Sequence, residues 1–205
     1  MIFLKFIAHR GLRTDEYKEN TLLAFQNAIK SEIMSGFEFD IRQTKDKKYV
    51  VNHNMFIKGN LIKHQTLKKL KKEYHLPSLN DVLKLNTDKI MLVEVKDSKL
   101  NYRKFVKIIN HYQDKNIYIM SFHNKVINKL KKYKIKAKLG ILNYILNTEE
   151  DYDYDFICLL NNLTTKEIID CYHRKNIEVF MYGVLNEEKD LFYQNVYYIV
   201  DEEPN

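Results

Sequence analysis

The sequence predicts a compact TIM (β/α)8 barrel, and two regularities along the chain carry this prediction. Short apolar runs alternate with segments of helical period, which is the pattern of repeated strand–helix units around a parallel sheet. Eight of these runs qualify as strands, as a closed barrel requires, and 205 residues lie near the ~200-residue lower limit of that fold. An open doubly wound sheet is the alternative. The expected strands are Phe3–His9, Phe37–Arg42, Ile90–Lys96, Ile117–Ser121, Ala137–Leu142, Phe156–Leu160, Glu178–Gly183 and Tyr197–Asp201.

Helical periodicity between these runs predicts the outer layer of the barrel. In the segment 21–33, Leu22, Phe25 and Ile29 recur on one face, as in an amphipathic helix. The chain ends at Pro204-Asn205, directly after the last expected strand, so we expect the last outer helix to be missing and a homodimer as one way to cover that part of the wall. Further helices are expected at Gln65–Tyr74, Tyr102–Tyr112, Lys125–Tyr133, Thr165–Lys175 and Glu187–Gln194.

Composition and charge indicate one ordinary globular domain. With 45% hydrophobic and 30% charged residues, residues 1–205 can form a single core, with residues 55–76 as a short insertion. The formal net charge of +7 comes almost entirely from lysines that are interspersed with leucines at helical spacing. We interpret them as solvated helix faces, so no nucleic-acid partner is expected.

Cysteine usage and hydropathy bear on location. Cys158 and Cys171 match no metal or redox motif and are expected to be free thiols. The apolar N-terminal run is too short for a signal peptide and is interrupted by Lys5, and no later run approaches the ~18 apolar residues of a membrane span. These features predict a cytoplasmic protein without stable membrane insertion.

Charged side chains gather where the first two expected strands end. Active-site residues of a barrel lie at the carboxyl ends of strands, and the first strand ends in His9 and Arg10. On the second strand Glu38 and Asp40 share a face, because strand side chains alternate with period two. Two converging buried carboxylates repel, so they need a hard divalent metal or an arginine between them. On this strand alone, a metal and an ion pair with Arg42 are equally good interpretations.

The third expected strand adds another carboxylate. Glu94 and Lys96 share one face, and an acid and a base at that spacing could simply neutralise each other. Neighbouring barrel strands, however, would bring Glu94 close to Glu38 and Asp40. Three carboxylates favour one metal and would leave Lys96 for a phosphate oxygen.

A second imidazole, His53, ends an extra extended segment after the second strand. Hydrolysis of a phosphodiester needs one group that removes a proton from the attacking oxygen and another that protonates the leaving oxygen. Histidine suits both tasks near neutral pH, which makes His9 and His53 candidates for the pair. A metal and Arg10 would stabilise the charge on the phosphoryl oxygens. Of the other histidines, His123 is the exception to a surface or helix assignment, because it lies at a strand end.

Together these residues resemble the N-terminal signature of the glycerophosphodiester phosphodiesterase family. The resemblance covers nearly the whole chain, with its dense motifs within residues 7–54 and 93–96. Looser agreement is found in Leu76–Leu83, Ser121-Phe122 and Ile199–Pro204. The dense part comprises His9-Arg10-Gly11, Glu19-Asn20-Thr21, Ala24-Phe25, Gly36, Glu38, Asp40, Thr44-Lys45-Asp46, Val50-Val51, His53 and Val93–Lys96.

The resemblance implies an activity, a cofactor and a set of site residues. The substrate it implies is a small-molecule glycerophosphodiester, cleaved to glycerol 3-phosphate and an alcohol, with a neighbouring hydroxyl of the substrate attacking phosphorus before water does. One divalent metal, Mg2+ or Ca2+, is the implied cofactor. The implied site consists of His9 and His53 as acid/base pair, Arg10 and Lys96 at the phosphate, Tyr182 at the substrate, and Glu38, Asp40 and Glu94 as metal ligands.

The chain departs from the family pattern at two informative positions. Asn54 stands where the family usually has an aspartate after the second histidine, which removes a charge beside His53. Tyr182 replaces an aromatic that is commonly tryptophan. The second change falls where the alcohol or glycerol would be recognised, so substrate identity is the least secure expectation.

Two other functions fit the same residues. A related barrel phospholipase would act on lysophospholipid or sphingomyelin and would need a wider apolar mouth. A catalytically weakened barrel that binds phosphate or RNA would need a basic stripe with interleaved aromatic residues. The inward-facing carboxylates argue against the second of these.

Overall fold

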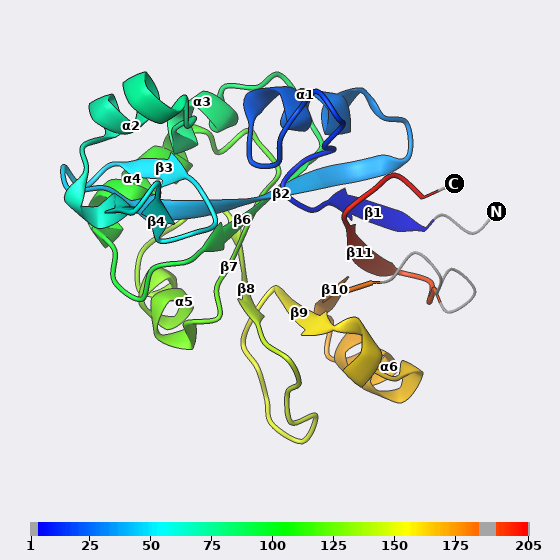
Figure 1. Ribbon diagram of the computed structural model, residues 1–205. Helices are drawn as coiled ribbons and strands as arrows, with labels where there is room; N and C mark the ends of the chain where they lie inside the picture. The colour runs from blue at the N-terminus through cyan, green and yellow to red at the C-terminus, as the bar shows by residue number, and fades with distance from the viewer. Residues whose placement is uncertain (1–3, 185–191, 205) are drawn as a thin grey trace.

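The computed structural model describes residues 4–184 and 192–204, and within them eight parallel strands close into a barrel (Figure 1). Each strand pairs with its neighbours in the order β1-β2-β6-β7-β8-β9-β10-β11, and β11 pairs with β1 to complete the ring. The predicted barrel is therefore confirmed. The strands are β1 (Lys5–Ala8), β2 (Met34–Gln43), β6 (Ile90–Val95), β7 (Ile117–Met120), β8 (Lys138–Leu142), β9 (Phe156–Leu160), β10 (Glu178–Tyr182) and β11 (Val196–Val200).

Helices cover the outside of the barrel between most strands. Helix α1 begins after Thr21, whose side chain accepts a hydrogen bond from the Ala24 amide, and it buries Phe25 against β2. The segment 143–155 between β8 and β9 contains no helix, and neither do residues 201–204 after β11. The predicted helix Glu187–Gln194 falls mostly outside the described residues. The helices are α1 (Leu22–Lys30), α2 (Leu67–Tyr74), α3 (Leu79–Leu83), α4 (Tyr102–His111), α5 (Asn124–Lys131) and α6 (Lys166–Arg174).

A long connection with short strands of its own separates β2 from β6. Strand β3 (Tyr49–Val51) pairs antiparallel with the end of β2. It is followed by a hairpin of β4 (Phe56–Ile57) and β5 (Asn60–Leu61) and by the 3-10 turn η1 (Ile62–His64). This connection thus places a short hairpin beside the carboxyl-terminal end of β2.

Strand alternation divides the core into two layers. On β2, Phe37 and Phe39 belong to the apolar layer between strands and helices. Residues of the opposite parity, such as Leu92 and Phe180, fill the inside of the barrel. Gly36 lies on that inner face of β2, where an added Cβ would lie 2.3 Å from the Ile90 carbonyl oxygen. A glycine there lets β2 and β6 approach closely and brings the next inward residues of the two strands together.

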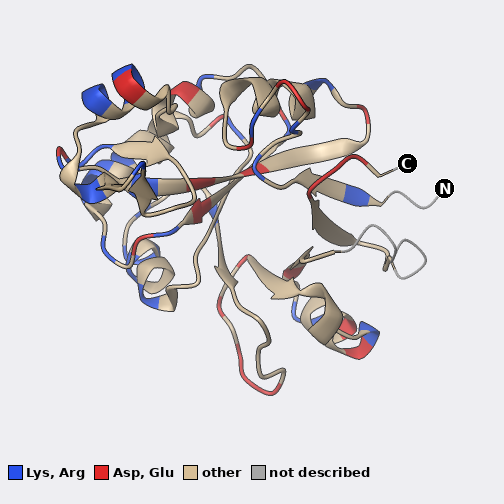
Figure 2. Ribbon diagram, in the orientation of Figure 1, with Lys and Arg blue, Asp and Glu red and all other residues tan. Residues whose placement is uncertain are grey.

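Charge is distributed unevenly over this fold. Figure 2 shows acidic positions on β2 and β6 at the middle of the barrel, with lysines and arginines on α2, α4 and α5 around them. None of the described helices has the length and apolar composition needed to cross a membrane.

Candidate active site

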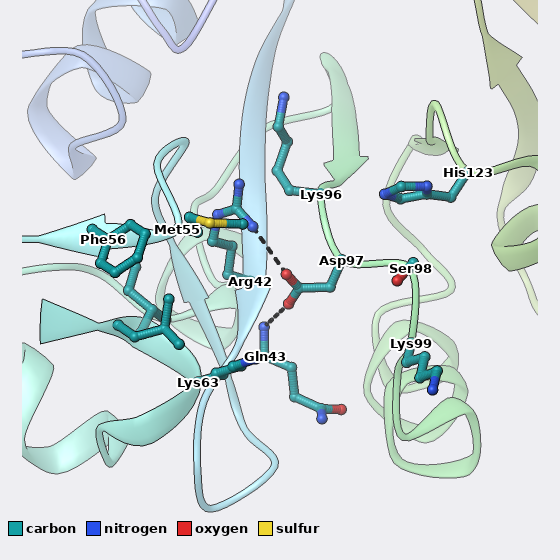
Figure 3. Close-up of a pocket in the computed structure, with 12 residues that line it drawn as sticks. Arg42, Gln43, Met55, Phe56, Lys63, Lys96, Asp97, Ser98, Lys99 and His123 are labelled. Carbon is teal, nitrogen blue, oxygen red and sulfur yellow. Dashed lines mark hydrogen bonds and ion pairs between the residues drawn. The ribbon is translucent and has the colours of Figure 1, made fainter.

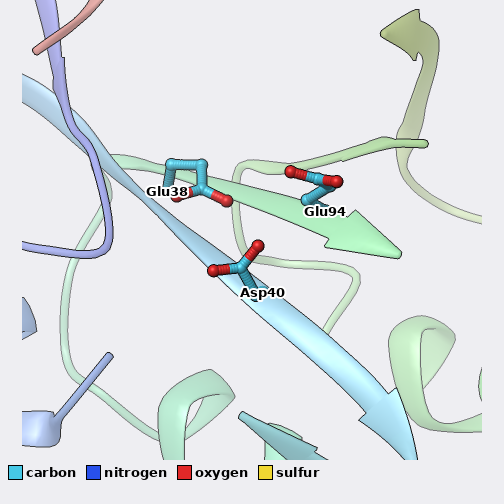
Figure 4. A group of neighbouring side chains, drawn as sticks. All are labelled: Glu38, Asp40 and Glu94. Atoms are coloured by element: carbon cyan, nitrogen blue, oxygen red, sulfur yellow. The ribbon is translucent and has the colours of Figure 1, made fainter. Parts of the chain in front are cut away.

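Three carboxylates meet inside the barrel. Asp40 of β2 lies in register with Glu94 of β6, and Glu38 lies one inward step earlier on β2. One oxygen from each of the three lies within 4.8 Å of the others (Figure 4). The residues Glu38, Asp40 and Glu94 are only 1%, 1% and 8% exposed respectively. The predicted convergence of these residues is what the fold produces.

Burial makes this cluster electrostatically unfavourable. Burial, followed by repulsion from Asp40 and Glu94, raises the pKa of Glu38 well above its usual range. Burial likewise raises the pKa of Glu94, although Lys96 opposes the shift. Within the described residues the buried Oε1 of Glu38 has no hydrogen-bond partner. An unpaired buried oxygen among three carboxylates fits a hard divalent cation, whose positive charge would remove the repulsion.

Two cations already contact the carboxylates. The Arg10 Nε lies 3.2 Å from Asp40 Oδ2. The Lys96 ammonium lies 2.7 Å from Glu94 Oε1 and 3.6 Å from Asp40 Oδ1, so it is engaged by the carboxylates. Arg42 does not take the ion-pair role that the sequence left open, because its guanidinium pairs with Asp97 at 3.0 Å. The side chain bends to Asp97 since that residue follows β6 at the rim, beyond Glu94.

His9 lies at the end of β1 with both ring nitrogens near carboxylates. Its Nδ1 lies 2.7 Å from Asp201 Oδ1, and its Nε2 lies 4.0 Å from Glu38 Oε2. An ionised carboxylate only accepts hydrogen bonds, so the His9 Nδ1 donates to Asp201, and this hydrogen bond lowers the pKa of Asp201. The hydrogen bond orients the ring so that Nε2 is turned toward the cluster. Asp201 follows β11, the strand that pairs with β1, and the sequence analysis gave it no function.

His53 lies beyond β3 at the other side of the cluster. Its Nδ1 is 3.1 Å from Asn54 Oδ1, and its backbone carbonyl accepts hydrogen bonds from Arg42 Nε at 2.9 Å and Nη2 at 2.7 Å. Burial lowers the pKa of His53, and the charges of Lys96 and Arg10 lower it further against the pull of Asp40. His53 is therefore close enough to Asp40, Lys96 and Arg10 for their charges to affect its protonation.

The loop between β1 and α1 forms hydrogen bonds with the carboxylates of the cluster. The Arg10 amide donates to Glu38 Oε2 at 3.0 Å, and Asn20 Nδ2 donates to Asp40 Oδ2 at 2.8 Å. The Asp40 amide returns a hydrogen bond to Asn20 Oδ1 at 3.3 Å. Glu19 holds the Arg10 guanidinium at 2.8 Å. Sequence reasoning gave Asn20 no function of its own, although the residue lies in the family motif Glu19-Asn20-Thr21 and directly before the cap of α1.

Aromatic side chains form the opposite side of the mouth. Tyr182 ends β10, and its ring meets Phe122 edge-on at 6.2 Å between centroids, while Phe122 contacts Tyr144 at 5.5 Å. The Tyr182 hydroxyl is buried without a hydrogen-bond partner in the described residues, and burial raises its pKa. Cys158 lies nearby on β9, buried and without a disulfide, and Cys171 is also free.

Solved structures share this fold from end to end. A glycerophosphodiester phosphodiesterase from Parabacteroides distasonis superimposes with a TM-score of 0.81 at 20% identity, covering 98% of this chain and 93% of that one. One from Thermotoga maritima gives 0.76 at 22% identity, with 97% and 95% covered. An Oleispira antarctica phosphodiesterase in complex with the product sn-glycerol-3-phosphate gives 0.80 at 16% identity, with 96% and 93% covered. At these identities the likeness establishes the fold.

Sequence comparison gives the family. No curated protein matches the chain at a significant level. The model of the glycerophosphoryl diester phosphodiesterase family, in contrast, matches residues 9–201. That range spans nearly the whole chain, from His9 of β1 to Asp201 after β11, and takes in the three buried carboxylates. The chain therefore belongs to the glycerophosphoryl diester phosphodiesterase family and is an enzyme of that class.

Proposed function

We propose that this enzyme is metal-dependent and cleaves glycerophosphodiesters to glycerol 3-phosphate and an alcohol with His9 and His53 as its acid/base pair. The observation that carries the proposal is the buried cluster of Glu38, Asp40 and Glu94 with the unpaired Glu38 oxygen, flanked by the two imidazoles. The Oleispira antarctica relative with bound sn-glycerol-3-phosphate supports the product class.

The metal would be held by Glu38, Asp40 and Glu94. Bound there, Mg2+ or Ca2+ would supply positive charge to the phosphoryl oxygens as negative charge builds on them. Arg10 supplies a second, permanent charge at the same place, since its guanidinium is held beside Asp40 by Glu19. The Lys96 ammonium can turn to a phosphate oxygen once its carboxylate partners are neutralised.

Proton transfer is assigned from the surroundings of each histidine. Because its pKa is lowered, His53 is neutral near pH 7 and can accept the proton of the attacking substrate hydroxyl. Asp201 orients His9 so that Nε2 faces the cluster, and in its imidazolium form, which carries a proton on Nε2 as well as on Nδ1, His9 would protonate the leaving oxygen. The new P–O bond to the substrate hydroxyl forms as the bond to the alcohol breaks. Water then opens the cyclic phosphate with the two proton transfers reversed.

A second candidate substrate is an intact lysophospholipid. Phe122 and Tyr144 are 41% and 58% exposed beside Tyr182, and Ile145 next to them is 53% exposed. This apolar surface at the rim could receive an acyl chain. Choline release from lysophosphatidylcholine, measured beside release from glycerophosphocholine, decides between the two substrates.

The test of the proposed function is hydrolysis of glycerophosphocholine and glycerophosphoethanolamine. Chelation should reduce turnover to background, and Mg2+ or Ca2+ should restore it. His9→Ala and His53→Ala should each lower kcat/KM by about 100- to 10,000-fold without lowering the melting temperature appreciably. His111→Ala, which changes an exposed histidine on α4, is the matched control. Turnover that persists after chelation, or near-normal rates in either histidine variant, would refute the proposal.

A further inference from the structure

A pocket of about 750 Å³ adjoins the carboxylate cluster (Figure 3). It is formed by the ends of β2 and β6, the β4–β5 hairpin with η1, and the start of the segment after β7. Met55 and Phe56 give it an apolar side, and both are about half exposed, at 53% and 51%. Of the residues assigned to the proposed catalytic site, Lys96 is the one that also lines this pocket.

The pocket is strongly basic. Its charged lining consists of four cations, Arg42, Lys63, Lys96 and Lys99, and one acid, Asp97, with His123 as a titratable neighbour. We call it the basic pocket. The acid is already committed, because it pairs with Arg42 at 3.0 Å and accepts the Gln43 amide at 2.6 Å.

Two of the four cations are uncompensated. Within residues 4–184 and 192–204, Lys63 and Lys99 lie within ion-pair distance of no acidic side chain. They come from different elements, η1 and the loop after β6, and line the same space as His123 (Figure 3). Unpaired, exposed ammonium groups at the rim of a half-enclosed pocket create a positive potential that favours an anion there.

The basic pocket shares two residues with the surroundings of the catalytic groups. Lys96 lines it while its ammonium contacts Glu94 and Asp40. Arg42 lines it while its guanidinium holds the His53 carbonyl. A phosphodiester whose phosphorus lies at the carboxylate cluster would therefore extend one of its two ester substituents into the pocket.

We propose that the basic pocket binds a second phosphate carried by the leaving alcohol, so that the preferred substrates are glycerophosphodiesters with an anionic head group. This inference rests on the proposed function. Choline or ethanolamine would bring a positive charge toward Lys63 and Lys99, which disfavours both head groups. The carbon atoms between the two phosphates would lie against Met55 and Phe56. Two forms of phosphate could fill the pocket: a terminal monoester, with three terminal oxygens and a charge of about −1.5 to −2, and an internal diester, with two non-bridging oxygens and one negative charge.

Substrate selectivity is the first test. Glycerophosphoglycerol would be compared with two relatives that carry a second phosphate on the released glycerol, one as a terminal monoester and one as the internal diester of bis(glycerophospho)glycerol. We expect kcat/KM to be about tenfold higher for at least one of the substrates with two phosphates, and the substrate with the larger gain identifies the form of phosphate. The preference should weaken as salt rises from about 0.05 to 0.5 M.

Charge-removing variants connect that selectivity to the pocket. The double variant Lys63→Gln/Lys99→Gln should reduce the preference toward unity. Lys107→Gln, which removes one charge from the exposed face of α4, should keep it. Equal kcat/KM for substrates with one and with two phosphates, or an unchanged preference in the double variant, would overturn the inference.

Binding is measured separately from turnover. Inorganic phosphate would be titrated into protein freed of metal by dialysis, with the His123 imidazole followed by NMR and assigned with His123→Gln. We expect a saturable shift that the double variant loses; no shift in the native protein would overturn the pocket as an anion site. If no diester is hydrolysed at all, the proposed function fails and the substrate assignment fails with it, whereas hydrolysis without selectivity overturns only the present inference.

Discussion

Two walls of the barrel share one backbone plan and have opposite chemistry. The acidic wall, β2 and β6, turns Glu38, Asp40 and Glu94 inward. The apolar wall, β8 to β10, turns Leu142, Cys158 and other apolar or aromatic residues inward at the corresponding height. Both are parallel strands with the same period-two alternation. The fold determines where an inward side chain lies, and only the residue type at that place determines whether the wall stabilises the protein or prepares it for catalysis.

The two walls therefore contribute to stability with opposite sign. Burial of the apolar wall stabilises the fold by roughly 25 cal/mol per Å² of apolar surface. Burial of three carboxylates destabilises it unless a cation is bound, and Arg10 and Lys96 compensate only part of the charge. Without metal, the contribution of Glu38 to stability should be most favourable where Glu38 is protonated. It should fall as pH rises from about 4.5, the ordinary value for glutamate, through the raised pKa of Glu38.

The strongest test of this contrast is Glu38→Gln in the acidic wall. We expect kcat/KM to fall by about 1,000-fold, because the proposed metal site loses one of its three carboxylates. The free energy of unfolding of the metal-free protein should nevertheless rise by about 1–2 kcal/mol near pH 7, because a buried, repelled charge is removed. The pH dependence of that stability should also flatten. Denaturant unfolding at several pH values, with and without metal, measures each effect.

Cys158→Ala is the counterpart in the apolar wall. It should lower stability by about 1 kcal/mol and leave kcat/KM within about twofold, because it removes buried packing and no charge. If Glu38→Gln destabilised the metal-free protein as Cys158→Ala does, the two walls would not differ in the way described.

Asn20→Gly probes how the acidic wall is kept in place. The change removes the hydrogen bonds that orient Asp40 and preserves the positive φ of 56° at this position. We expect metal affinity and kcat/KM each to fall by about 10- to 100-fold, as for other groups that orient a ligand. Calorimetric titration of metal gives the affinity. Asn195→Gly, at a φ of 62° between β10 and β11, is the control, and an equal loss there would attribute the effect to the backbone.

Sequence reasoning found the acidic wall because its rule is local. Alternation along β2 and β6 was sufficient to place Glu38, Asp40 and Glu94 on the inner face, and the count of strands was sufficient for the barrel. The partners of these residues depend on contacts between distant segments. Asp201 reaches His9 across 192 positions through the pairing of β11 with β1.

The sequence left the compensating cation undetermined for the same reason. Arg42 is the arginine nearest to Asp40 along β2, but its guanidinium pairs with Asp97, which follows β6 at the rim. Arg10 reaches Asp40 instead, because the loop after β1 crosses the mouth with positive φ at Arg10 and Gly11. Loop conformation of that kind has no periodicity from which it could be predicted.

The smallest expected effect concerns charge near His53, at the edge of the acidic wall. Asn54 contacts the His53 ring without adding charge, and burial lowers the pKa of His53 below its ordinary 6.5. The acidic limb of the pH profile of kcat/KM should therefore lie below pH 6.5, since His53 must be neutral to accept a proton. Asn54→Asp would place a carboxylate on the ring, stabilise the imidazolium and move that limb upward by about half a unit to one unit. The rate would fall at pH 6 and change little at pH 8.

NMR titration of His53 should show the same shift of its pKa. The control Asn86→Asp, an exposed change in the loop before β6, should leave both the pH profile and the His53 pKa unchanged. A limb that stayed in place while the His53 pKa rose would assign the proton-accepting step to another group.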